Sequence, residues 1–180
     1  MKKILLLSVI VFSFLSSFAQ DKKLSLGIAP MIAFPTGDFK KYNNTGYGGD
    51  FQLVYALNEH FDLAFDMALI SFSAATTQMD NITYIGVNMF NMKTSLGARY
   101  KIGGFHAGAG LGRSAFYFSE YGQTQSVSGL VLTPEIGYKL GRFDLSGNFS
   151  YNFVNTNTNT SNINFFGLKL AFNVFEKEVN

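Results

Sequence analysis

Apolar side chains alternate with polar or small ones along most of the chain. In the stretch "FDLSGNFSYNF", residues 143–153, the odd positions hold Phe, Leu, Gly or Tyr, and the even positions hold Asp, Ser or Asn. Successive side chains of a β-strand point to opposite faces, so this stretch predicts a strand with one apolar and one polar face. A helical period of 3.6 residues would mix the two sets.

The same alternation predicts eight strands, at about 23–34, 47–57, 61–73, 84–102, 105–118, 127–140, 143–154 and 163–175. Short connections at 58–60, 103–104 and 141–142 alternate with long ones at about 35–46, 74–83, 119–126 and 155–162. Transmembrane β-barrels have short periplasmic turns and longer external loops. The pattern therefore predicts an all-β fold: an eight-stranded antiparallel up-and-down barrel.

The segment "FHAGAGLGRSAFYF", 105–118, fits the alternation least well. Its polar face consists mostly of Gly, and Arg113 falls on the apolar parity. Two explanations stay open: a β-bulge that shifts the parity, or a position of Arg113 at the membrane rim.

Composition decides between a soluble and a membrane barrel. Charged residues make up 14% of the chain, against about 25% in typical soluble domains. Aromatic residues make up 16%, with 20 Phe. Small residues and Asn dominate the polar face. A solvent-exposed surface would instead be rich in Lys and Glu. We therefore expect the apolar face to meet lipid and the polar face to line the lumen, and a secreted soluble barrel is less favoured.

The N-terminus has the pattern of a secretory signal peptide. Lys2 and Lys3 precede an apolar stretch over 4–15, and Ser17 and Ala19 fit a cleavage site after Ala19. We expect a signal peptide at 1–19 and an outer-membrane β-barrel domain at 20–180; a retained N-terminal helix is the alternative. The domain would carry equal numbers of basic and acidic residues, so no attraction to nucleic acid is expected. The chain has no Cys.

Four charged residues on the polar face are predicted to meet inside the barrel. Counted from the short turns, Asp66, Arg99 and Glu135 lie at similar depths, and Lys169 joins them from the last strand. Charges in a narrow interior persist only when they are paired. Asp50 and Lys93 are further candidates for this network, and Lys139 and Asp144 could pair at the lumen mouth. Unrelated charges facing bulk water are the alternative.

Three similar segments, "YALNEHFDL", "YKIGGFHA" and "YKLGRFDL", each straddle a short turn. In each, a Tyr closes one strand and a Phe opens the next, both on the apolar face. Girdles of aromatic residues mark both interfaces of outer-membrane barrels. We therefore predict a periplasmic aromatic girdle of Tyr55, Phe61, Tyr100, Phe105, Tyr138 and Phe143; coincidence in a Phe-rich chain is the alternative.

The stretches "SLGIAPMIAFPTGDF", "YGGDFQLVYAL", "LGARYKI" and "GAGLG" resemble the outer membrane protein beta-barrel domain family. These are small barrels of Gram-negative bacteria, similar to the OmpX, OmpA and OmpW types. The resemblance implies residence in outer-membrane lipid and contact with the barrel-assembly machinery during biogenesis. The last strand resembles the assembly signal, but "EKEVN" follows Phe175 where that signal usually ends, and we interpret these five residues as a short periplasmic tail.

No catalytic, cofactor or metal site is expected. His60 and His106 both lie at the short-turn end, so no Ser–His–acid group can form near the long loops, and two His residues are too few for a metal site.

Eight strands enclose an interior just wide enough for side chains. We predict a monomeric, non-enzymatic barrel with a plugged lumen and a structural or surface-interaction role, in which the extracellular loops bind an unidentified ligand. A narrow OmpW-like channel for small or hydrophobic solutes is the alternative, with some apolar lumen near the long-loop end from Val54, Ile70, Phe72, Phe116 and Phe118. A lipid-modifying enzyme is less favoured.

Overall fold

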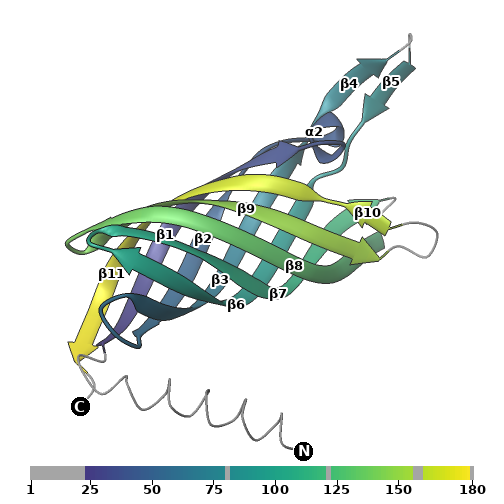
Figure 1. Cartoon of the computed structure of the whole chain (residues 1–180). Helices are drawn as coiled ribbons and strands as arrows, with labels where there is room; N and C mark the ends of the chain where they lie inside the picture. Colours follow the sequence, from purple (N-terminus) through teal and green to yellow (C-terminus); the bar gives the residue numbers. More distant parts are fainter. Residues whose placement is uncertain (1–22, 80–81, 121–122, 156–159, 179–180) are drawn as a thin grey trace, which may run out of the picture.

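Eight long antiparallel strands close into a barrel in the computed structural model (Figure 1). The structure describes residues 23–79, 82–120, 123–155 and 160–178, so the predicted signal peptide lies outside the described residues. The barrel strands are β1 (Lys23–Thr36), β2 (Asn43–Ala56), β3 (Phe61–Ala74), β6 (Met89–Ile102), β7 (Phe105–Glu120), β8 (Gln123–Leu140), β9 (Phe143–Asn155) and β11 (Asn164–Glu178). Each pairs with the barrel strands before and after it in the chain, and β11 pairs with β1 to complete the ring. The predicted eight-stranded up-and-down topology is confirmed.

The predicted strand 84–102 is wrong at its start. Residues Ile82–Ile85 form β5, which pairs only with β4 (Thr76–Met79) in a separate two-stranded sheet that projects beyond the barrel rim (Figure 1). Where the barrel ladder ends below this sheet, side chains bind the backbone: Asn43 Nδ2 donates to the Val87 carbonyl, and Asn88 Oδ1 accepts from the Ala74 N–H, both at 2.8 Å. The apolar parity changes between Tyr84 and Ile85 and again between Met89 and Phe90, and the prediction of one strand over 84–102 overlooked this irregularity.

Two short elements complete the long-loop end. Helix α2 (Phe39–Tyr42) lies within the first long connection, and β2 begins directly after it, at Asn43, earlier than expected. Strand β10 (Thr160–Asn162) extends the end of β9 as a short hairpin.

The predicted C-terminal tail is wrong for Glu176, Lys177 and Glu178, which continue β11 and pair with the start of β1. A β-bulge precedes them, because Asn173 lies opposite Gly27 and Phe175 lies opposite Leu26. The extra residue leaves both Val174 and Phe175 exposed on the outer face. It also reverses the parity of the following residues.

The two faces of the barrel differ as the alternation predicts. Large apolar side chains face outward, with Ile136 65% and Leu140 69% exposed. Buried polar and charged side chains, including Asn91, Asn148 and Asn152, face the lumen. No helix among the described residues is both long and apolar enough to cross a membrane.

Two of the three short turns, at 103–104 and 141–142, depend on glycine. Gly103 and Gly141 both have φ of 59°, in the left-handed region. For any other residue this conformation costs about 1–2 kcal/mol. We expect Gly141→Val to lower the free energy of unfolding by about that amount in urea titrations of the refolded barrel. Arg142→Ala in the same turn is the matched control and should leave stability unchanged; equal losses in both variants would contradict the argument.

Candidate functional site

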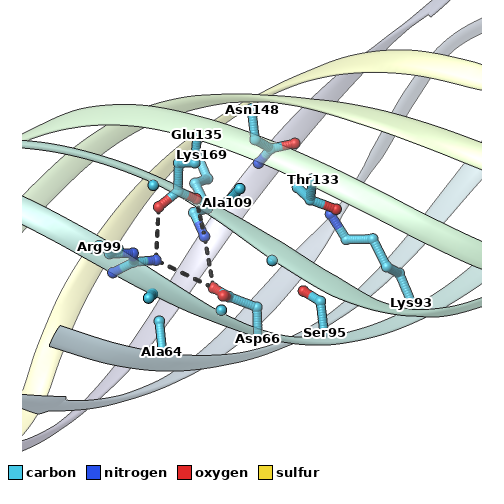
Figure 2. Close-up of a pocket in the computed structure, with 14 residues that line it drawn as sticks. Ala64, Asp66, Lys93, Ser95, Arg99, Ala109, Thr133, Glu135, Asn148 and Lys169 are labelled. Atoms are coloured by element: carbon cyan, nitrogen blue, oxygen red, sulfur yellow. Dashed lines mark hydrogen bonds and ion pairs between the residues drawn. The ribbon is translucent and has the colours of Figure 1, made fainter. Parts of the chain in front are cut away.

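The lumen holds a buried layer of ion pairs at mid-barrel (Figure 2). Arg99 Nη2 lies 2.7 Å from Glu135 Oε1 and 3.5 Å from Asp66 Oδ1. Lys169 Nζ lies 2.9 Å from both Asp66 Oδ1 and Glu135 Oε2. Strands β3, β6, β8 and β11 thus bring the four predicted residues together, and each acid contacts both cations. The arrangement closes a ring across the barrel.

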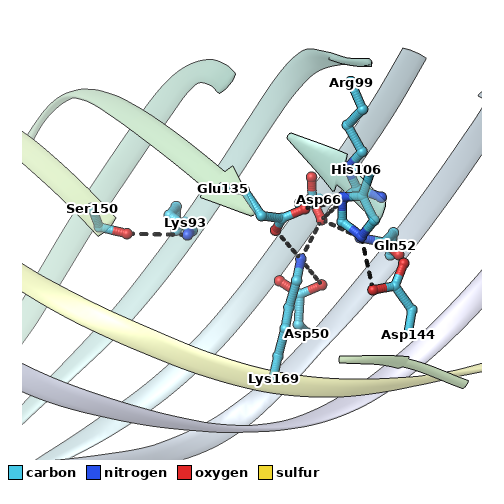
Figure 3. A network of polar contacts seen from close by, with 10 residues as sticks. All are labelled: Asp50, Gln52, Asp66, Lys93, Arg99, His106, Glu135, Asp144, Ser150 and Lys169. Carbon is cyan, nitrogen blue, oxygen red and sulfur yellow. Dashed lines mark hydrogen bonds and ion pairs between the residues drawn. The ribbon is translucent and has the colours of Figure 1, made fainter. Parts of the chain in front are cut away.

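Asp50 and Lys93, the two further candidates for the network, make different contacts. Asp50 Oδ1 lies 3.5 Å from Lys169 Nζ, at the edge of the ion-pair layer. Lys93 instead donates to Ser150 Oγ at 3.2 Å (Figure 3). Its Nζ lies 5.9 Å from the centre of the Phe165 ring. Gln52 donates to Asp66 Oδ1 at 2.9 Å. Sequence reasoning missed Gln52, although its inward parity, two residues after Asp50, was available.

Glycines on β7 give the ion-pair layer its room. The lumen side of β7 carries Gly108, Gly110 and Gly112 in register with β6. A Cβ atom at Gly108 would lie only 2.9 Å from Cγ of Arg99, and one at Gly110 would lie 3.2 Å from Oγ of Ser95. The Gly-rich face that weakened the strand prediction for 105–118 therefore accommodates the long side chains of β6. The remaining cavity beside the ion pairs measures about 20 Å³, enough for about one water molecule.

Above the ion pairs, toward the long loops, the lumen is filled by apolar side chains. Phe39 of α2 packs edge-on against Phe72, with ring centres 5.0 Å apart, and against Phe116, at 6.0 Å. Phe165 lies 5.4 Å from Phe72. Met31, Ala33, Ala68, Ile70 and Val154 complete this apolar layer. Of the predicted apolar lumen residues, Ile70, Phe72 and Phe116 belong to it.

Val54 does not lie near the long-loop end as expected. It lines a cavity of about 130 Å³ at the short-turn end, because β2 runs toward its short turn and ends at Ala56. Phe118 is half-buried on β7, outside the cluster of fully buried apolar residues.

Charged pairs surround the cavity at the short-turn end. His106 Nε2 lies 3.0 Å from Asp144 Oδ1, and Lys101 Nζ lies 2.6 Å from Asp62 Oδ1. The predicted Lys139–Asp144 pair is wrong: Lys139 Nζ binds Glu176 Oε1 at 2.7 Å. The bulge in β11 explains the error, because it returns Glu176 to the lumen side. Among the described residues, no group of three or more His, Cys, Asp or Glu side chains could hold a metal ion.

The aromatic residues near the short turns pair between hairpins. The rings of Phe61 and Tyr100 are 5.1 Å apart, and those of Phe105 and Tyr138 are 4.7 Å apart, both edge-on. Phe143 lies 5.3 Å from Phe172, a partner that sequence reasoning did not name. Tyr55 lies opposite Leu24 and Leu63 on the neighbouring strands. Each of the three ring pairs therefore joins neighbouring strands that belong to different short-turn hairpins.

An apolar outer face, a filled polar lumen and long loops at one end define a small transmembrane β-barrel of the outer-membrane type. The chain belongs to the outer membrane protein beta-barrel domain family, whose model matches residues 4–174. This confirms the predicted resemblance and supports an outer-membrane location.

Solved structures of small outer-membrane proteins have a similar fold. Ail, the attachment invasion locus protein of Yersinia pestis, in complex with the heparin analogue sucrose octasulfate, is 13% identical with a TM-score of 0.58. A second Ail crystal structure is 15% identical with a TM-score of 0.57. Each match covers 88% of this chain and all of Ail. Neisserial surface protein A is 13% identical with a TM-score of 0.48, covering 88% of this chain and 97% of its own. No curated protein matches the chain in sequence.

Removal of one acid from the ion-pair layer should destabilise the barrel. The Glu135 side chain is only 7% exposed and contacts both Arg99 and Lys169. We expect Glu135→Gln to lower the free energy of unfolding by about 3 kcal/mol, because it removes a counter-charge that two buried cations share. Urea unfolding in detergent micelles measures this loss.

The exposed Glu59→Gln, in a short turn, is the matched control and should be neutral. The double variant Glu135→Gln, Lys169→Gln should recover part of the loss because it restores the charge balance. A double variant whose loss equals the sum of the single losses would contradict the pairing argument.

Proposed function

We propose that this protein is a closed, non-conducting outer-membrane barrel that acts through its long-loop end in surface interactions. The observation that carries the proposal is the filling of the lumen in two successive layers. The ion pairs of Arg99 and Lys169 occupy mid-barrel, and the apolar layer under Phe39 occupies the outer half. A barrel of eight strands has no further space for a solute path beside such side chains.

The long-loop end offers an interaction surface. The two-stranded sheet β4–β5 stands clear of the barrel (Figure 1), so its outer edges are not paired within the described part of the chain. Exposed strand edges are a common docking element for extended segments of other proteins. Loops held on a rigid scaffold often carry the binding function of a protein. These features support a role in contact with partners outside the cell.

A catalytic role has less support. The buried His106 lies with Asp144 at the short-turn end, whereas an enzyme that acts on outer-leaflet lipid needs its site near the long loops. A narrow channel also has less support, because the apolar layer is packed ring against ring rather than lining a path.

The closed lumen can be tested by electrical recording. We expect the refolded chain in a planar bilayer to show no sustained conductance above that of the bare membrane. The variant Phe39→Ala, Phe72→Ala, Phe116→Ala removes the apolar layer and should also stay closed, because the ion pairs remain. Steady single-channel currents from the unaltered chain would contradict the proposal and favour the narrow channel.

The interaction surface should not favour polyanions, in contrast to the Ail structure that holds a heparin analogue. The long connections contain Lys40 and Lys41 as their only cations, against three acids, and Lys41 Nζ lies 2.8 Å from Asp38. We expect no retention on a heparin column at physiological ionic strength. Retention that disappears in Lys40→Gln, Lys41→Gln would show that a sulfated ligand class had been wrongly dismissed.

A further inference from the structure

Arg113 lies on the lipid-facing side of the barrel. The ladders on both sides of β7 run through it without a register shift, with Thr94 opposite on β6 and Leu130 opposite on β8. A bulge therefore does not explain its parity. The side chain is exposed, on the same face as Leu111 and Tyr117.

This position separates the charge from the acids whose ion pairs the structure describes, which face the lumen side. Among the described residues, the only other charged residue at an outward position of a barrel strand is Lys177, near the short-turn end of β11. The acids of the barrel strands whose ion pairs the structure describes face the lumen side, where they pair with Arg99, Lys169, Lys101, His106 and Lys139. A guanidinium without a counter-charge at the middle of the lipid face would cost about 2–4 kcal/mol, and less near an interface.

The depth of Arg113 places it close to an interface. Strands rise about 3.3 Å per residue and tilt about 40°, so the stretch from Phe105 to Arg113 rises roughly 20 Å through the membrane. The apolar band of such barrels is about 25 Å tall. With Phe105 at its lower edge, the Cα atom of Arg113 lies only about 5 Å below the upper edge. An extended Arg side chain can span that distance and bring its charge to the headgroups.

The surroundings of Arg113 fit an anion at this level. The next outward residue on β7 is Ala115, whose small side chain leaves space toward Tyr117 and the loops. Ser128 lies opposite Ala115 on β8, and Thr94 lies opposite Arg113 on β6. The register thus places one guanidinium between two hydroxyl groups on an otherwise apolar surface.

We propose that Arg113, with Ser128 and Thr94, forms a binding site for the phosphate of a lipid in the leaflet at the long-loop end. The planar guanidinium donates two parallel hydrogen bonds to phosphate oxygens, and the hydroxyl groups donate further ones. The lipid's acyl chains lie along the apolar outer face of β7 and β8, and the ligand supplies a counter-charge that no described outward residue of the barrel strands offers.

The test uses the full chain refolded in an uncharged detergent and titrated with short-chain phosphatidylglycerol, with bound lipid counted by native mass spectrometry. We expect the first lipid to bind Arg113→Gln about tenfold more weakly than the unaltered chain, as the loss of a charge-assisted hydrogen bond predicts. Arg142→Gln, which removes the arginine of a short turn at the opposite end, should bind as the unaltered chain does. Arg113→Lys should bind with intermediate affinity, because it keeps the charge but loses the two-pronged geometry.

Three outcomes would overturn the proposal. Equal affinity of Arg113→Gln and the unaltered chain would show that the site does not exist. An equal loss in Arg142→Gln would show general charge attraction. Displacement of the lipid by inorganic phosphate at the same concentration would show a site for free anions instead of lipid. A boiled-against-unboiled gel shift on every variant establishes that each forms the barrel.

Discussion

The pairing of every backbone N–H and C=O group is the constraint on which this structure depends. Lipid offers no hydrogen bonds, so a sheet that crosses it must close on itself. Here the closure is made by β1 and β11, and it tolerates a bulge at Val174 next to Gly27. Closure at eight strands fixes a narrow interior. Everything inside the barrel must therefore be side chain, and each inward position has to fit its neighbours from the opposite wall.

The narrow interior explains why long charged side chains lie next to glycines. Arg99 and Lys169 meet the same acids in the lumen, and the side chain of Arg99 has room because its neighbour on β7, Gly108, has no side chain. Burial of a charge is tolerated when its partner is close and correctly placed. The glycine face and the ion pairs are thus one arrangement, in which the loss of space or of a counter-charge disturbs the same residues.

Alternation predicted the strands, the lengths of the connections predicted their order, and the composition of the polar face predicted the inward direction of Asp66, Arg99, Glu135 and Lys169. Counting residues along each strand from its short turn also predicted that these four residues lie at similar depths in the barrel. The prediction failed where the alternation is irregular or is shifted locally. The first event is the transfer of 82–85 to the β4–β5 sheet, near which the apolar parity changes at Tyr84–Ile85 and at Met89–Phe90, and the second is the bulge before Phe175. The bulge turns Glu176 to the lumen side, where it binds Lys139. Unshifted alternation would have placed Glu176 on the outer face.

Parity also sorts the charges of the barrel into two sets with different consequences. Inward charges find partners from other strands, because every lumen position faces another wall within a side chain's reach. An outward charge has no opposite wall, and the unshifted ladders around Arg113 keep it outward. Its counter-charge must then come from the surrounding bilayer. With the lumen filled, the surfaces that remain available for molecular contact are the long-loop end and the lipid face, and Arg113 lies close to where these two surfaces meet.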